Sequence, residues 1–215
     1  MAIIRIILSL FIVLVAPILA VGQAFEGTIR YKNESISDTA YVTYNVSKNL
    51  IRIDETSSTG QLTRSTIVNL GNKTVTALDP LKKLYTDIYP KPANQFTSSD
   101  FEINRTGNQK MISGYKCYHW RVKNKSANTE ISYWVAEDNF GFFDELLKTL
   151  PLADNQYTFF LSIPQSEGFL PLDICERTLL RDIKNKLYLL DIKKQPIEPS
   201  VFEVPVGYSQ YQASR

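Results

Sequence analysis

The sequence has very few of the residues on which most catalytic and metal sites depend. Of its 215 residues, one is histidine and two are cysteine. A hydrolytic triad would rest entirely on His119, and the chain contains neither a Gly-x-Ser-x-Gly turn nor a His-Glu-x-x-His motif. Cys117 and Cys175 are too far apart in sequence to form a Cys-x-x-Cys pair. We therefore expect no catalytic residues, no metal site and no cofactor, and we expect that the protein is not an enzyme.

Concentrated charge is also missing. The formal net charge is +2, and the 24 basic and 22 acidic residues are interspersed along the chain. A nucleic-acid-binding surface needs a dense basic patch to neutralise phosphates. The composition therefore argues against nucleic acid as a partner.

The first 24 residues have the pattern of a cleavable secretory signal peptide. Arg5 precedes an apolar run from Ile6 to Leu19, and small residues follow. We expect cleavage after Ala24, with Gln23 as a second possible end, so that residues 1–24 are removed and residues 25–215 form a single domain. An uncleaved anchor is the alternative, but the apolar run is shorter than the roughly 20 residues that a spanning helix needs.

Gln23 also stands where a bacterial lipoprotein would need a cysteine for its lipid. The mature protein is therefore expected to be periplasmic or secreted, without a lipid anchor and without a membrane-spanning segment.

From Phe25 onward, apolar and polar residues alternate with a period of two, and turn-forming residues interrupt the alternation about every ten positions. This pattern is typical of antiparallel sheets. It predicts a mainly β protein of about ten strands, arranged as a barrel or as one large curved sheet.

One segment departs from this rhythm and predicts a short amphipathic helix between Gly141 and Leu150. Phe143, Leu146, Leu147 and Leu150 stand at i, i+3, i+4 and i+7, which is a single apolar stripe. Pro151 disfavours helical geometry in the residue before it, so the helix must end there. Because so short a helix is marginal alone in water, its stripe must pack on the sheet.

The stretch GYKCYHWRV, from Gly114 to Val122, reads as one strand. Strand geometry places Tyr118, Trp120 and Val122 on one face, which is the better core row, and leaves Cys117 and His119 on the other. A structural histidine with local hydrogen bonds is favoured there over a metal ligand.

The cysteines leave two possibilities open. In an exported protein, Cys117 and Cys175 could form a disulfide that stabilises the fold by about 4 kcal/mol. Alternatively, each is a separately buried thiol.

Several segments together resemble an uncharacterised family of exported bacterial proteins that carries only a domain-of-unknown-function label. The segments are FEGTIRYK from Phe25, the stretch from Ile67 to Ile88, MISGYKCYHWRV from Met111, EISYWVAED from Glu130 and SVFEVPVGY from Ser200. That family is similar in turn to the periplasmic LolA/LolB lipoprotein carriers. Their fold is a strongly curved antiparallel sheet, an incomplete β-barrel, whose short helices close its open side over an apolar cavity for acyl chains.

The resemblance implies that the helix predicted here packs on the concave side as a lid. Phe143, Leu146, Leu147 and Leu150 would then face a cavity that holds a lipid acyl chain or another hydrophobic small molecule, in envelope lipid or lipoprotein handling. The carriers have more helices than the one that this sequence predicts. The alternative function is a structural or protein-interaction module of the cell envelope, with a solid core and an envelope protein as its partner.

Overall fold

The computed structural model describes residues 24–89, 100–151 and 154–211. The predicted signal peptide therefore lies outside the described residues, except for Ala24.

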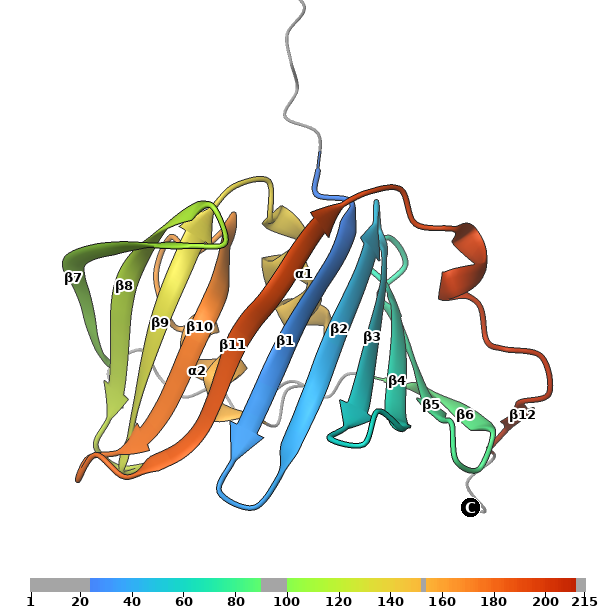
Figure 1. Ribbon diagram of the computed structural model, residues 1–215, viewed down its shortest axis with the longest axis horizontal. Coiled ribbons are helices and arrows are strands. Elements are labelled where there is room, and N and C mark those ends of the chain that lie inside the picture. The colour runs from blue at the N-terminus through green and yellow to red at the C-terminus, as the bar shows by residue number, and fades with distance from the viewer. Residues whose placement is uncertain (1–23, 90–99, 152–153, 212–215) are drawn as a thin grey trace, which may run out of the picture.

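The described residues contain twelve strands that form one sheet (Figure 1). In chain order the strands are β1 (Gly27–Ser35), β2 (Thr39–Ser47), β3 (Leu50–Ser57), β4 (Leu62–Asn69), β5 (Thr74–Asp79), β6 (Leu84–Ile88), β7 (Glu102–Ile112), β8 (Tyr115–Asn124), β9 (Thr129–Glu137), β10 (Phe169–Thr178), β11 (Ile183–Lys194) and β12 (Ser209–Gln210). Their order across the sheet is β12-β6-β5-β4-β3-β2-β1-β11-β10-β9-β8-β7.

Two runs of strands that are neighbours both in the chain and in the sheet, β1 to β6 and β7 to β11, meet at the centre of this sheet. The joint is the antiparallel pairing of β1 with β11, in which Gly27 lies opposite Lys194 and Ser35 opposite Asn185. Only β12 departs from the antiparallel pattern among the described strands, because it lies parallel to β6.

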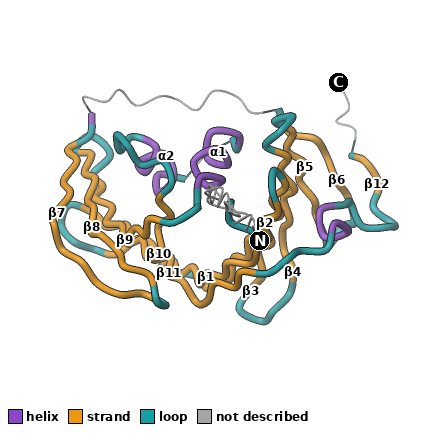
Figure 2. The backbone as a smooth tube through the Cα atoms, turned by 90° about the horizontal axis from the view of Figure 1, so that it is seen from above, coloured by secondary structure: helices purple, strands orange, loops and turns teal. Residues whose placement is uncertain are grey.

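The sheet curves into an open arc, and both α-helices lie on its concave side (Figure 2). Helix α1 (Gly141–Thr149) has the bounds that the apolar stripe predicted. Helix α2 (Asn155–Leu161) was not predicted, so the expectation of one helix was too low. The predicted fold class, a mainly β protein with a strongly curved antiparallel sheet and a short helix in its concavity, is confirmed.

The core fills the concave side where the helices meet β8 to β11. Phe143 of α1 packs against Phe160 of α2 with ring centroids 5.6 Å apart, and Phe160 packs against Tyr133 of β9 at 5.5 Å. Fully burying a side chain of this kind contributes about 1.5–3 kcal/mol. Further members of this aromatic cluster are Phe25, Trp120, Phe140, Phe142 and Phe159, all buried.

After β11, at the centre of the sheet, the chain runs to the edge that β6 and β12 form. The 3₁₀ helix η2 (Pro199–Phe202) contacts β3, where the Arg52 guanidinium donates a 3.1 Å hydrogen bond to the carbonyl of Val201. Phe202 is buried at this contact. This C-terminal segment includes β12, which pairs with the outer edge of β6.

Candidate functional site

A cavity of about 440 Å³ lies on the concave side, between the β2–β6 half of the sheet and the segment that joins α1 to α2. The aromatic cluster therefore fills only part of the concavity. The described residues that line the cavity are Asn33, Ala40, Val42, Tyr44, Ile53, Glu55, Arg64, Thr66, Val75, Ala77, Ile88, Leu150, Pro151, Asp154, Gln156, Tyr157, Asn185 and Leu187.

The strand pattern explains why one wall of the cavity is apolar. Side chains alternate between the two faces of a strand, so the buried row of each strand points into the concavity. Val42 and Tyr44 belong to this row on β2, Ile53 on β3 and Val75 on β5, and all four are buried. Leu187 of β11 extends the wall toward the centre of the sheet.

The other end of the cavity is polar. Glu55 and Arg64 lie opposite each other on β3 and β4 and form an ion pair at 3.5 Å. Their side chains are 36% and 67% exposed, so this end is open to solvent. Because exposed ion pairs contribute little to stability, this pair fixes the fold only weakly and leaves both charges accessible to a ligand.

Two buried amide oxygens add to the polar end. Oδ1 of Asn33 on β1 and Oδ1 of Asn185 on β11 have no hydrogen-bond partner among the described residues. Both residues line the cavity, and an unpaired buried polar atom costs about 1–3 kcal/mol. A ligand with a polar head could therefore gain hydrogen bonds here that the chain leaves unmade.

A pair of tyrosines links the sheet to the second helix on the cavity wall. The hydroxyl oxygens of Tyr44 on β2 and Tyr157 on α2 lie 3.1 Å apart. Burial raises the pKa of Tyr157 to about 12 and raises the pKa of Tyr44 well above its usual value. Both hydroxyls are therefore protonated at neutral pH and act as hydrogen-bond donors and acceptors without charge.

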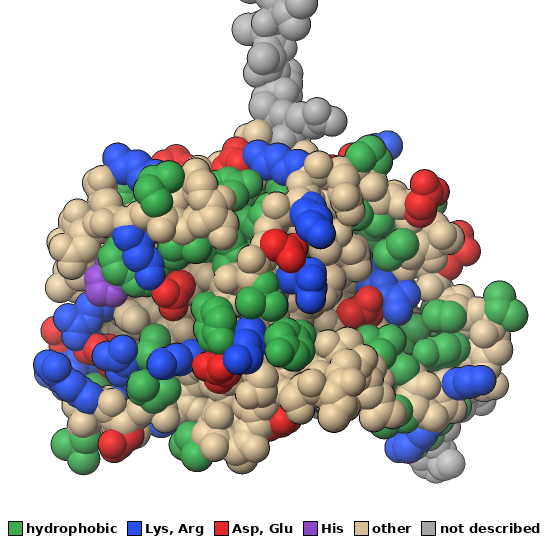
Figure 3. Space-filling view, viewed as in Figure 1, with side chains coloured by type: hydrophobic (Ala, Val, Ile, Leu, Met, Phe, Trp, Pro, Cys, Tyr) green, Lys and Arg blue, Asp and Glu red, His purple; other side chains and the backbone are tan. Residues whose placement is uncertain are grey.

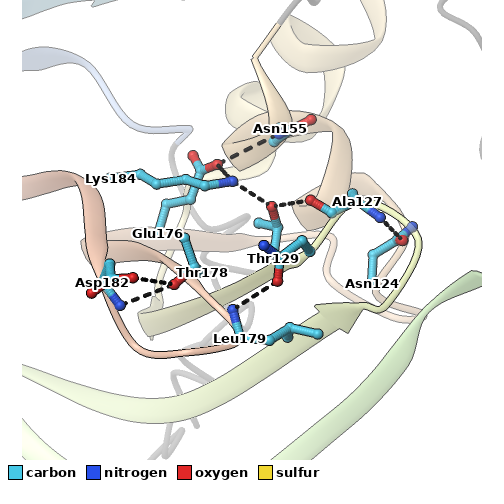
Figure 4. Close-up of polar contacts among 10 residues, drawn as sticks. Asn124, Ala127, Thr129, Asn155, Glu176, Thr178, Leu179, Asp182 and Lys184 are labelled. Atoms are coloured by element: carbon cyan, nitrogen blue, oxygen red, sulfur yellow. Dashed lines mark hydrogen bonds and ion pairs between the residues drawn. The ribbon is translucent and has the colours of Figure 1, made fainter.

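A polar network secures the start of α2 on the sheet (Figure 4). Glu176 of β10 is buried and accepts a 3.5 Å hydrogen bond from Asn155, the first residue of α2. A β-bulge after Glu176 shifts the register of β11, and Nζ of Lys184 lies 3.9 Å from Glu176 and donates a 2.8 Å hydrogen bond to Thr129. The network fixes the helix that supplies Gln156 and Tyr157 to the cavity.

The proposed lid residues divide into two groups. Phe143, Leu146 and Leu147 are at most 3% exposed and belong to the hydrophobic core cluster. Leu150, at the C-terminal end of the stripe, lines the cavity. The stripe therefore holds α1 on the sheet and places one of its four members in the candidate site.

His119 faces the convex side, away from the cavity. Its Nδ1 lies 3.0 Å from Oγ1 of Thr106, and its ring stacks on Trp134 with centroids 4.6 Å apart. Burial, with the nearby cations Arg121 and Lys110, lowers the pKa of His119. Trp120 and Val122 lie in the core as the alternation predicted.

No group of three or more potential metal ligands occurs among the described residues. The two cysteines also stay apart: Cys117 on β8 and Cys175 on β10 are buried free thiols. Strand β9 lies between them, and their partners on it are Ala136 and Ser132. Two strand spacings of about 4.8 Å already exceed the Cα separation that a disulfide allows.

The charged and amide residues of the cavity were not identified from the sequence. Asn33 continues the inward row of Ile29 and Tyr31, and Glu55 continues that of Ile51 and Ile53. A polar residue in the apolar phase of a strand, close to the strand's end, is the signal that could have located them.

The sequence pattern of a domain of unknown function, DUF4412, matches residues 25–208. The chain belongs to this family. No curated protein is significantly similar to it in sequence.

Among solved structures, this DUF4412 chain is similar to an uncharacterized conserved protein from Thermus thermophilus, with a TM-score of 0.54 and 7% identity over 86% of this chain and 90% of that one. This likeness shows the fold alone. Weaker likenesses are to MucB in complex with MucA(peri), with a TM-score of 0.48 and 9% identity over 85% of this chain and 55% of that one. Another is to a putative outer membrane lipoprotein-sorting protein domain from Vibrio parahaemolyticus, with a TM-score of 0.31 and 8% identity over 82% of this chain and 87% of that one.

Within residues 24–89, 100–151 and 154–211, neither α-helix has the length and apolar character needed to cross a bilayer.

Proposed function

We propose that the protein binds a lipid, an acyl chain or another hydrophobic ligand in the concave cavity, as a non-enzymatic exported protein of the cell envelope. The observation that carries this proposal is the unfilled space of about 440 Å³ beside a packed core. Small-molecule sites commonly measure roughly 300–1,000 Å³ and combine apolar walls with a few polar groups. The export part of the proposal depends on the signal-like pattern of residues 1–24.

The apolar wall and the polar end of the cavity suit a ligand that has a hydrocarbon chain and a polar head. Val42, Ile53 and Val75 would contact a hydrocarbon chain, and each CH₂ removed from water contributes about 0.8 kcal/mol. Arg64 and the unpaired oxygen of Asn185 would contact its polar head. Leu150 and Tyr157, from the segment beside the helices, would cover the chain from the other side.

The first experiment is mass spectrometry of lipids that co-purify with the protein from its native envelope. The second is titration with a fluorescent fatty acid. Ala77→Phe adds bulk to the cavity wall, and we expect it to weaken fatty-acid binding at least about tenfold by filling the site. Thr76→Phe is the matched control, because the side chain of residue 76 lies on the opposite face of the same strand.

Three results would contradict the proposal. They are the absence of any co-purified lipid together with no fatty-acid binding, equal binding by wild type and Ala77→Phe, and equal losses in Ala77→Phe and Thr76→Phe.

The outer edge of β7, which pairs with no further strand among the described residues, supports a second candidate, a protein-interaction module of the envelope. Strand β7 ends the sheet, and β8 is its only strand partner among the described residues. Such an edge offers backbone groups for pairing with a strand from another protein. A stable envelope-protein complex that holds no lipid, with crosslinks that map to residues 102–112, would favour this function over the first.

A further inference from the structure

Exposed aliphatic side chains gather at one rim of the sheet. This lower rim is formed by the turns at residues 36–38, 58–61, 80–83, 125–128 and 179–182, which lie along the bottom of Figure 1. Ile36 is 84% exposed, Leu81 61%, Leu180 83% and Ile183, which directly follows the last turn, 44%. Each comes from a hairpin end, where a polar residue would cost nothing to the fold.

Cations accompany these aliphatic side chains. Lys83, Lys125 and Arg181 are exposed on the same turns, and none takes part in an ion pair between described residues. Figure 3 shows hydrophobic and basic side chains along the lower left of the molecule, with a few acidic side chains among them. Exposed aliphatic side chains beside unpaired cations are the combination that binds an anionic bilayer surface, because each kind contributes separately.

The polar end of the cavity lies toward this same rim. Asn33 is opposite Ala40 beside the β1–β2 turn, and Glu55 is opposite Arg64 beside the β3–β4 turn. Asn185 lies in β11 close to the β10–β11 turn. The open, polar end of the candidate site and the exposed aliphatic side chains therefore share one side of the molecule.

We propose that the lower rim docks on an anionic lipid bilayer, with Ile36, Leu81, Leu180 and Ile183 entering the interface and Lys83, Lys125 and Arg181 contacting lipid phosphates. This docking rests on the proposed function in one respect only, since it would bring the polar end of the cavity to the membrane from which a lipid enters or leaves.

The test is co-sedimentation of the protein from Phe25 onward, the start of the family match, with vesicles. Phosphatidylglycerol mixed with phosphatidylcholine is the anionic probe, and phosphatidylcholine alone is the neutral one. We expect binding to the anionic vesicles that falls as salt rises. The double variant Ile36→Ser/Leu180→Ser should bind at least about tenfold more weakly, and Lys125→Gln/Arg181→Gln should lose about fivefold for each charge removed.

Met111→Ser is the matched control, because Met111 is 65% exposed but lies beside the β7–β8 turn at the opposite rim. It should bind the anionic vesicles as the wild type does. All the substituted residues are exposed, so thermal unfolding should be unchanged in every variant. The proposal is overturned if the wild type fails to sediment with anionic vesicles, or if Met111→Ser weakens binding as much as the rim variants do.

Titration with a free fluorescent fatty acid separates this proposal from the first one. Rim variants that lose vesicle binding should still bind the fatty acid as the wild type does. Fatty-acid binding without vesicle binding would refute the docking and leave the cavity function standing. Vesicle binding without fatty-acid binding would refute the cavity function and leave the docking standing.

Discussion

The hydroxyl oxygens of Tyr44 and Tyr157 lie 3.1 Å apart and join β2 to α2. Tyr44 is only 6% exposed, so its hydroxyl has little access to water. Loss of either hydroxyl would remove the hydrogen bond that it makes with the other. This pair links α2 directly to the half of the sheet that forms the cavity.

A double-mutant cycle measures that link. Tyr44→Phe and Tyr157→Phe should each lower the free energy of unfolding by about 1 kcal/mol, and the double variant should lose less than the sum of the two. Urea denaturation gives the values. Tyr211→Phe is the control, because Tyr211 is 55% exposed and should have no effect. Strictly additive losses would show that the two hydroxyls do not interact.

The same two tyrosines should also make the fold sensitive to alkali. The pKa of Tyr157 is raised from 10.0 to about 12 in the folded state, so the unfolded chain releases this proton first as pH rises. The folded state then binds more protons than the unfolded state, and stability falls with increasing pH. The stabilisation should be complete below pH 10 and lost between pH 10 and about 12. Urea unfolding at several pH values tests this, and Tyr157→Phe should show a shallower decline.

Residues of the apolar stripe of α1 should differ in what they contribute, one to the stability of the fold and another to ligand binding. Leu146 is fully buried, so Leu146→Ala should lower the free energy of unfolding by about 2–5 kcal/mol. Leu150 is only partly buried and lines the cavity, so Leu150→Ala should cost less stability and weaken fatty-acid binding more. Chemical denaturation and ligand titration of both variants give the comparison. The same stability loss in both, with no change in binding for Leu150→Ala, would contradict the division.

A larger residue at position 27 should destabilise the fold. Its φ is +151°, and an added Cβ would lie 2.0 Å from the carbonyl oxygen of Lys193 on β11. Gly114→Ala is a control for backbone strain alone, since Gly114 has a φ of +85° and no neighbouring atom within 4 Å of the added Cβ. Gly27→Ala should cost about 1–3 kcal/mol more than Gly114→Ala in urea denaturation. Equal losses would show that the strand joint yields to the extra atom.

The sequence predicted those features that depend on residues close together in the chain. The spacing of Phe143, Leu146 and Leu147 predicted helix α1, and Pro151 predicted where it ends. Helix α2 escaped prediction because its seven residues form barely two turns and contain a run of aromatic residues that a buried strand could equally carry. Its helical state depends on the aromatic cluster into which Phe159 and Phe160 pack.

Features that depend on the order of strands in the sheet could not be predicted from the sequence. The distance between Cys117 and Cys175 depends on β9 lying between their strands. The grouping of Asn33, Glu55 and Asn185 around one cavity likewise requires β1 to lie between β2 and β11. Local alternation assigns each side chain to a face but does not specify which strands become neighbours.

The pairing of β1 with β11 has a consequence for how the chain folds. The first long strand cannot complete its hydrogen bonds on both sides until residues 183–194 arrive, and the whole of β2 to β10 intervenes in sequence. Each half can form hairpins early, but closing the middle requires a very long loop, which slows folding. We therefore expect slow refolding, in which the two runs of neighbouring strands form first and the pairing of β1 with β11 forms last.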